Sequence, residues 1–181
     1  PLYEASVQDA GEHLAFFRLI HAELSGDRPA RILREDFCGT FLISRAWVRQ
    51  GPEYHAYGLD IDPAPLAYGK KRAREELTRE QQSRLHIQKK NAISVTRPSA
   101  DILAVCNFSF YVLHDRQTLV EYFKKARQSL RRKGGLMILE MAGGPGFIQT
   151  GIERKTFKLP NGKKCLYFWQ QKSFDPISRL G

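Results

Sequence analysis

Short apolar runs and longer amphipathic stretches alternate along the first 140 residues of the chain. The apolar runs predict buried strands at residues 32–33, 54–60, 85–88, 101–106 and 136–141. Apolar positions at helical spacing predict helices at residues 9–24, 41–48, 62–77 and 115–132. This alternation predicts an α/β fold with a Rossmann-like, doubly wound, mostly parallel sheet.

The pattern changes after the glycine-rich segment 143–146. Residues 155–159 and 164–171 are two candidate strands, and they flank an Asn161-Gly162 turn. Asn-Gly between two such runs is a strong signal for a β-hairpin. We therefore expect an antiparallel C-terminal hairpin beside the parallel sheet.

The most informative stretch lies between residues 30 and 40. Ile32 and Leu33 end the first apolar run, Glu35-Asp36 follows, and Cys38-Gly39-Thr40 forms a turn before the next helix. A strand, a small-residue turn and a helix N-terminus can hold a nucleotide-like ligand against the backbone. Asp60 ends the second strand 21 residues after Gly39, where an acid can accept hydrogen bonds from ribose hydroxyls. The competing interpretation of Asp60 is a helix-capping acid, a role that Asp62 fills more naturally.

Five ordered segments together resemble a class I S-adenosylmethionine-dependent methyltransferase over about residues 30–142. They are Ile-Leu-Arg-Glu-Asp-Phe-Cys-Gly-Thr, Gly-Leu-Asp-Ile-Asp-Pro, Gln-Lys-Lys-Asn-Ala, Ala-Asp-Ile-Leu-Ala-Val-Cys-Asn-Phe-Ser-Phe and Arg-Lys-Gly-Gly-Leu-Met-Ile-Leu-Glu. The first motif of that family carries an acid followed by three alternating glycines. Glu35 matches the acid and Gly39 the middle glycine, while Phe37 and Phe41 replace the outer two.

The resemblance implies S-adenosylmethionine as cofactor and a set of residues that bind it. Glu35 and the backbone of the following turn would border the methionine part, and Asn91-Ala92 would meet the adenine, although an Asn after a strand is often only a turn former. The full expected set is Glu35, Phe37, Cys38, Gly39, Asp60, Ile61, Asn91, Ala92 and Asn107.

Residues 107–111, Asn-Phe-Ser-Phe-Tyr, follow the fourth strand and are similar to the Asn-Pro-Pro-Tyr motif of amino-group methyltransferases, with both prolines absent. The acceptor candidates are Tyr3, Gln8, Phe108, Phe110, Tyr111 and His114. The alternatives are core packing for the aromatic side chains and a structural role for His114 beside a helix start. No catalytic residue is assigned, because the sulfonium methyl is already activated and the protein mainly has to align the acceptor.

The resemblance also divides the chain into an N-terminal helical lid segment (1–29), a cofactor-binding core (30–142) and a C-terminal hairpin (143–181). Because the sheets of this class close with an antiparallel pair of strands that the sequence does not fully supply, we expect the C-terminal part to be incomplete.

Chain length and composition limit the number of domains and the cellular compartment. The 181 residues suffice for about one domain, and no apolar run approaches the roughly 20 residues of a membrane span. Three widely separated cysteines show neither metal-ligand spacing nor a disulfide framework, which favours a reducing, cytoplasmic compartment.

The net charge of +10 is unusual and has two interpretations. It could serve an anionic partner, nucleic acid included. The favoured interpretation is that Lys and Arg populate solvated helix faces, because no aromatic-interleaved RNA-binding motif accompanies them.

The sequence therefore predicts a methyltransferase that acts on an unidentified acceptor, with a small molecule expected. The alternatives are a nicotinamide-dependent oxidoreductase and a non-catalytic basic module that binds an adenosine ligand or nucleic acid. The missing glycines argue against the oxidoreductase, since a pyrophosphate needs close backbone approach.

Overall fold

The computed structural model describes residues 4, 9–26, 28–159, 162–175 and 177–178. Tyr3 and Gln8, two of the acceptor candidates, lie outside these residues. The chain divides into a compact unit of residues 10–140 and a second unit that contains the segment from Met141 onward.

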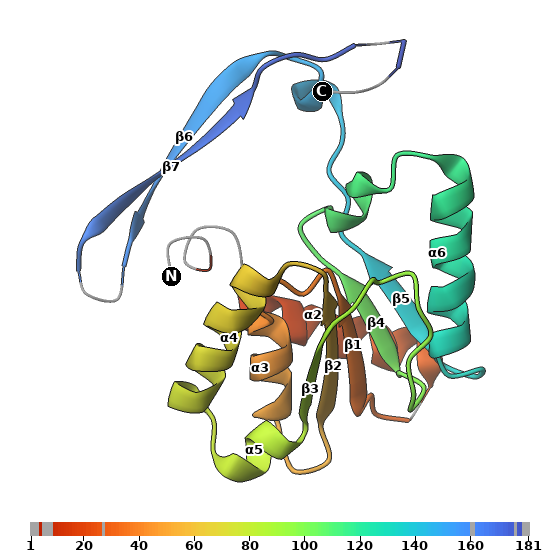
Figure 1. The fold of residues 1–181 in the computed structure, drawn as a ribbon. Helices are drawn as coiled ribbons and strands as arrows, with labels where there is room; N and C mark the ends of the chain where they lie inside the picture. Colours follow the sequence, from red (N-terminus) through yellow and green to blue (C-terminus); the bar gives the residue numbers. More distant parts are fainter. Residues whose placement is uncertain (1–3, 5–8, 27, 160–161, 176, 179–181) are drawn as a thin grey trace. The chain divides into compact units, whose positions relative to one another are not determined.

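The first unit is built on a five-stranded sheet in the order β3-β2-β1-β4-β5 (Figure 1). Its strands are β1 (Ile32–Asp36), β2 (His55–Asp60), β3 (Leu85–Lys89), β4 (Ile102–Val105) and β5 (Leu136–Leu139). Every neighbouring pair is parallel. The strand order reverses between β1 and β4, and this is the point where doubly wound sheets bind ligands at their carboxyl ends. The predicted Rossmann-like fold is confirmed.

Helices cover both faces of this sheet. They are α2 (Ala10–Ser25), α3 (Leu42–Val48), α4 (Pro63–Glu76), α5 (Arg79–Ser83) and α6 (Arg116–Ser129). Side chains of α2, α3 and α4 share one apolar cluster with β1 and β4. Helix α6 covers the other face of the sheet (Figure 1), where its side chains form a second apolar cluster with β4. The two clusters give the sheet a core on each face, as parallel sheets require.

Side-chain caps explain where several helices begin. Asp62 accepts a hydrogen bond from the Ala64 N–H at the start of α4, and Asp115 accepts one from the Thr118 N–H at the start of α6. Thr78 and Gln81 form a capping box at α5. The short α5 was not predicted, because its residues carry no apolar stripe and none is buried.

The first strand is longer than predicted. We expected it to end at Leu33, but β1 continues through Arg34, Glu35 and Asp36, and all three side chains are buried. Because side chains alternate along a strand, Arg34 and Asp36 point to one face of the sheet and Glu35 to the other. Three charged residues therefore lie inside the central strand, where desolvation is costly unless each one has partners.

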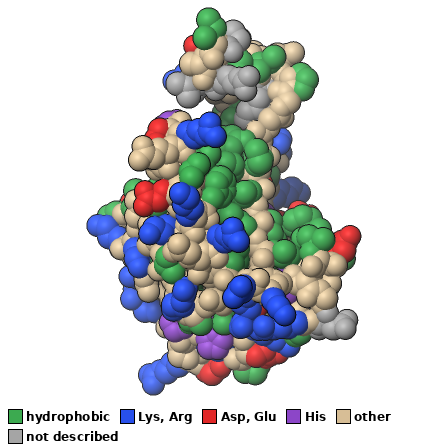
Figure 2. All heavy atoms as spheres, turned by 90° about the vertical axis from the view of Figure 1, so that its right-hand side faces the viewer, with side chains coloured by type: hydrophobic (Ala, Val, Ile, Leu, Met, Phe, Trp, Pro, Cys, Tyr) green, Lys and Arg blue, Asp and Glu red, His purple; other side chains and the backbone are tan. Residues whose placement is uncertain are grey.

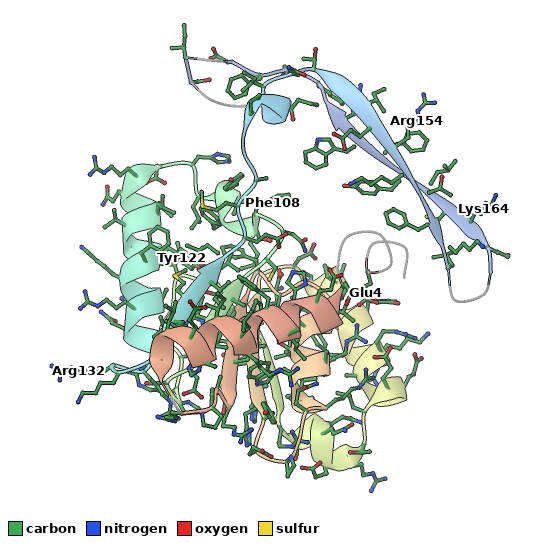
Figure 3. All side chains as sticks on the ribbon, turned by 180° about the vertical axis from the view of Figure 1, so that it is seen from behind. Glu4, Phe108, Tyr122, Arg132, Arg154 and Lys164 are labelled. Carbon is green, nitrogen blue, oxygen red and sulfur yellow. The ribbon has the colours of Figure 1, made fainter. Side chains whose placement is uncertain are left out.

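The second unit contains an antiparallel hairpin of β6 (Gly151–Lys158) and β7 (Lys164–Gln171). Figure 3 shows side chains projecting from both faces of this ribbon, including Arg154 and Lys164. Apolar side chains on it are exposed, among them Ile152, Leu166 and Phe168. The predicted hairpin is confirmed, with its first strand beginning four residues earlier than expected, at Gly151.

Basic side chains of α6 lie on an exposed face of the protein. On the face next to α6, Lys and Arg side chains are spread among uncharged and acidic ones (Figure 2). Arg116, Lys124 and Arg127 of α6 are exposed there, in agreement with solvated helix faces. Among the described residues, no helix is long and apolar enough to cross a membrane.

Candidate cofactor site

The turn after β1 retains the backbone of a glycine-rich motif without its two outer glycines. Phe37, Gly39 and Phe41 have φ values of 54°, 51° and 47°, so all three adopt the left-handed conformation. A bulky residue there costs roughly 1–2 kcal/mol. The two phenylalanines therefore occupy the outer glycine positions of the motif in glycine-like conformations, at a cost that must be offset elsewhere.

Packing of the two rings provides that compensation. Phe41 is fully buried, and its ring lies against Gly69 of α4, where any larger side chain would collide with the ring and with the Thr40 carbonyl. Phe37 packs on the other face against Tyr122 of α6, with ring centroids 5.8 Å apart. Fully burying a phenylalanine side chain contributes about 1.5–3 kcal/mol, which is large enough to offset the conformational cost at Phe41, and the half-buried Phe37 gains part of this.

Asp60, at the carboxyl end of β2, fixes the middle of this turn. Its Oδ2 accepts a hydrogen bond from the Gly39 N–H at 2.7 Å, and its Oδ1 accepts one from the Asp62 N–H at 2.9 Å. Asp62 rather than Asp60 caps the following helix, as expected. An ionised carboxylate has about four acceptor positions, so these two bonds leave capacity for hydroxyl donors.

The space in front of the turn suits a ligand. A methyl group built on Gly39 would meet no other heavy atom of the described residues within 4 Å. Ile61, directly after Asp60, is 65% exposed and offers an apolar surface. Cys38 is buried and packs against Gly58 of β2, so only its backbone is placed to face a ligand. A partly exposed acid, an open glycine and an exposed apolar side chain fit an adenosine-containing cofactor.

Glu35 lies beneath the turn rather than in front of it. The residue is 2% exposed, and its Oε2 accepts hydrogen bonds from both the Ser44 N–H and the Ser44 hydroxyl. Helix α3 begins after Phe41, which has no side chain that can cap it. Glu35 therefore supplies the missing cap from β1 and holds the turn against the helix.

The pKa of Glu35 makes stability depend on pH. Burial raises this pKa from its ordinary value of 4.5 to about 7, although the Ser44 hydrogen bonds and the charges of Arg45 and His13 lower it. Between these two values the folded chain binds a proton that the unfolded chain has lost. The free energy of unfolding should therefore fall as pH rises through this window.

Glu35→Gln should remove this dependence. From about pH 5 to about pH 8, the free energy of unfolding of the wild type should fall by up to about 3 kcal/mol more than that of the variant. Urea unfolding at several pH values measures the difference. The exposed substitution Glu23→Gln serves as the control and should follow the wild-type profile. Parallel profiles for wild type and Glu35→Gln would contradict the raised pKa.

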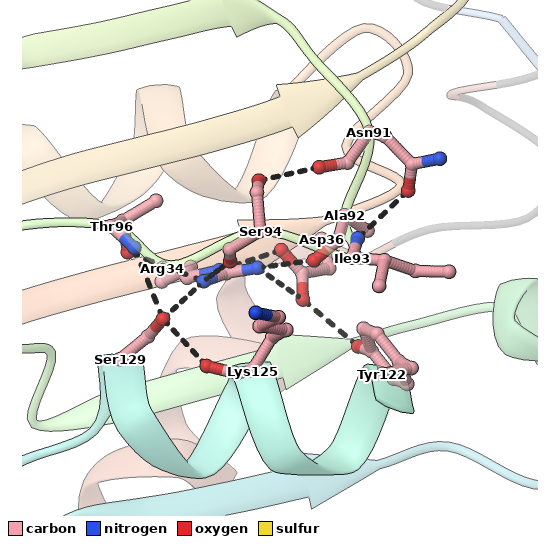
Figure 4. Close-up of polar contacts among 10 residues, drawn as sticks. All are labelled: Arg34, Asp36, Asn91, Ala92, Ile93, Ser94, Thr96, Tyr122, Lys125 and Ser129. Atoms are coloured by element: carbon pink, nitrogen blue, oxygen red, sulfur yellow. Dashed lines mark hydrogen bonds and ion pairs between the residues drawn. The ribbon is translucent and has the colours of Figure 1, made fainter. Parts of the chain in front are cut away.

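A buried network on the opposite face of β1 was missed by the sequence reasoning (Figure 4). Arg34 donates to both carboxylate oxygens of Asp36, at 2.7 and 3.1 Å, and Tyr122 donates to Asp36 at 2.9 Å. The Arg34 guanidinium also donates to four groups beyond β1: the Ala92 and Ser94 carbonyls, the Thr96 hydroxyl and the Ser129 hydroxyl. One side chain thus joins the central strand to the loop after β3 and to α6.

This network fixes the loop that carries the predicted adenine contacts. The Ala92 carbonyl is held by Arg34 at 2.7 Å, and Ala92 itself is buried. Asn91 is exposed, and its Oδ1 accepts a hydrogen bond from the Ile93 N–H at 2.8 Å. Asn91 is therefore a turn former in this structure, and its contact with adenine stays a prediction.

The loop after β4 carries the remaining predicted residues. Asn107 and Phe108 both have positive φ values, and the Asn107 N–H donates to Glu140 at the end of β5 at 2.7 Å. Figure 3 shows Phe108 at this edge of the sheet. Phe110 is buried in the core, which supports the packing alternative for that ring, whereas Tyr111 and His114 are exposed. Acceptor contacts of these residues stay predictions.

The sequence belongs to a known family. Residues 36–138, more than half of the chain, match the model of the methyltransferase domain, and the chain is a member of this family. The predicted class, a class I S-adenosylmethionine-dependent methyltransferase, is confirmed by this match. A search of curated proteins found no match to the sequence.

Solved structures share the fold at low sequence identity. The glycopeptide N-methyltransferase MtfA in complex with S-adenosylmethionine superposes with a TM-score of 0.61 at 15% identity, covering 92% of this chain and 68% of that chain. The sugar N-methyltransferase KedS8 from Streptoalloteichus sp. ATCC 53650 gives 0.66 at 16% identity, covering 98% and 79%. DesVI from Streptomyces venezuelae gives 0.69 at 11% identity, covering 98% and 83%.

Proposed function

We propose that this chain binds S-adenosylmethionine across the carboxyl ends of β1 and β2 and directs its methyl group to a small-molecule acceptor. The observation that carries this proposal is the left-handed turn at residues 37, 39 and 41, pinned by the Asp60 carboxylate at 2.7 Å from the Gly39 nitrogen. MtfA has been solved with S-adenosylmethionine, sinefungin and S-adenosylhomocysteine, which supports the same cofactor here. Nothing in the comparisons supports an oxidoreductase or a non-catalytic binding module.

In this proposal, different residues contact different parts of the cofactor. Asp60 accepts hydrogen bonds from the ribose hydroxyls, the backbone of residues 37–39 borders the methionine part, and Ile61 packs on the adenosine. Asn91 and Ala92 flank the adenine, and Asn107 lies toward the methyl group. When bound, S-adenosylmethionine supplies an electrophilic methyl on a sulfonium, so the protein mainly aligns the incoming nucleophile. Glu35 and Arg34 act through the loops that they hold.

An amino group is the first acceptor chemistry to test. Two of the structural neighbours are described as N-methyltransferases, of a glycopeptide and of a sugar, and CalS10 from Micromonospora echinaspora as an amino pentose methyltransferase. The exposed Tyr111 and the adjoining Phe108 offer aromatic surface beside the expected methyl position. Amino sugars are therefore the first acceptors to assay with labelled methyl donor.

Thermal unfolding with S-adenosylhomocysteine tests the cofactor assignment. A ligand present at about 100 times its dissociation constant adds about 2.7 kcal/mol of stability, which should raise the unfolding midpoint by roughly 5–10 °C. NADH and buffer alone are the controls. A rise with NADH but not with S-adenosylhomocysteine would overturn the proposal.

A further inference from the structure

Three side chains of different chemistry meet at the carboxyl edge of β4 and β5. His13 comes from the first turns of α2, Cys106 follows β4, and Glu140 follows β5. One donor atom of each, a ring nitrogen, the thiol sulfur and a carboxylate oxygen, lies within 4.8 Å of the other two. His13 Nε2 is 3.7 Å from Glu140 Oε2. All three residues belong to the unit of residues 10–140, so the sheet itself brings them together.

We propose that His13, Cys106 and Glu140 form a binding site for a Zn²⁺-like transition-metal ion. Imidazole, thiolate and carboxylate are the side chains that bind zinc in proteins. Bonds of about 2.0–2.3 Å in a tetrahedral site separate the donor atoms by roughly 3.3–3.8 Å. The observed spacing reaches that geometry with small side-chain movements.

The surroundings favour a cation at this position. Cys106 is 7% exposed, and a Glu140 carboxylate oxygen lies within 4.8 Å of its sulfur, so a cation at this position would meet negative charge in a largely buried place. The Glu140 Oε2 atom is oriented by the Asn107 N–H at 2.7 Å, and the His13 ring packs edge-on against Phe17 with centroids 6.0 Å apart. Outer contacts of this kind hold metal ligands in place.

The site opens onto a cavity of about 280 Å³ whose walls include Phe16 and Phe17 of α2. Three protein ligands leave the fourth position of a tetrahedral ion for a water or a small ligand, as in catalytic zinc sites. The ion therefore faces this cavity and binds a ligand with an oxygen or sulfur donor. This inference does not rest on the proposed cofactor.

Zinc titration of the purified chain, prepared without a histidine tag and stripped with a chelator, tests the site. In competition with a chromophoric chelator, the wild type should bind one Zn²⁺ per chain. Cys106→Ser and His13→Gln should each weaken the affinity at least ~10-fold. Co²⁺ should give a thiolate charge-transfer band in the wild type that Cys106→Ser lacks.

Matched controls use a thiol and an imidazole outside the cluster. Cys165→Ser and His55→Gln should bind Zn²⁺ like the wild type. Circular dichroism and the S-adenosylhomocysteine thermal shift show whether each variant is folded and separate this result from the proposed function. Absence of stoichiometric binding, or equal affinity in the wild type and the cluster variants, would leave His13 and Glu140 as an ordinary ion pair beside a buried thiol and overturn the inference.

Discussion

Arg34→Ala should lower the free energy of unfolding of this chain by about 3–5 kcal/mol. The guanidinium is fully buried and bonds Asp36, the loop after β3 and Ser129 of α6. Asp36 is 1% exposed in the wild type, so removal of the guanidinium leaves a buried carboxylate without its cation. A single domain is stable by only about 5–15 kcal/mol, so urea unfolding should show a large decrease.

Two further variants separate loss of the charge pair from loss of packing. Replacing both partners, as Arg34→Met with Asp36→Asn, removes both buried charges and should cost less than Arg34→Ala alone. The exposed Arg18, which bonds Gln50 at 2.9 Å, is the matched control, and Arg18→Ala should change stability by no more than about 0.5 kcal/mol. A decrease in Arg34→Ala no larger than in Arg18→Ala would show that the network contributes nothing.

The order of strands and helices followed from apolar periodicity, because that periodicity directly reflects burial against a sheet. Asp62-Pro63 and Asp115 gave helix starts that the structure confirms, since capping is a local interaction. Burial within α2 was less well predicted. The helix was predicted from its apolar positions, yet the polar His21 is 3% exposed, whereas the apolar Leu24 is 65% exposed.

The network around Arg34 could not be predicted from apolar periodicity, because its partners lie up to 95 residues away. One signal was present in the sequence: Arg34 and Asp36 are two residues apart on a strand and so share a face. If the first strand had been extended to residue 36, this spacing would have predicted a buried ion pair between Arg34 and Asp36. The turn itself was predicted, but the left-handed conformation of Phe37 and Phe41 was not, because glycine is the residue that normally adopts it and here packing of the two rings compensates for its cost.

Asp60→Asn should weaken S-adenosylhomocysteine binding by about 100-fold while leaving the chain folded. Hydrogen bonds to a charged acceptor contribute about 1.5–3 kcal/mol each, and each 1.4 kcal/mol corresponds to a tenfold change in affinity. The asparagine keeps one acceptor oxygen, but its NH2 group only donates, so it cannot accept from the Gly39 N–H, the Asp62 N–H and the ribose hydroxyls together. Isothermal calorimetry measures the affinity, and circular dichroism checks the fold.

Asp62 provides the control for this experiment, two residues away on the same loop. Its carboxylate accepts from the Ala64 N–H at 2.9 Å and caps α4, so Asp62→Ala should lower stability by about 1 kcal/mol. Affinity for S-adenosylhomocysteine should stay within about twofold of the wild type, because in the proposed binding mode only Asp60 contacts the ribose. Equal losses of affinity in the two variants would mean that Asp60 acts only by shaping the loop. An unchanged affinity in Asp60→Asn would remove the ribose contact from the proposed site.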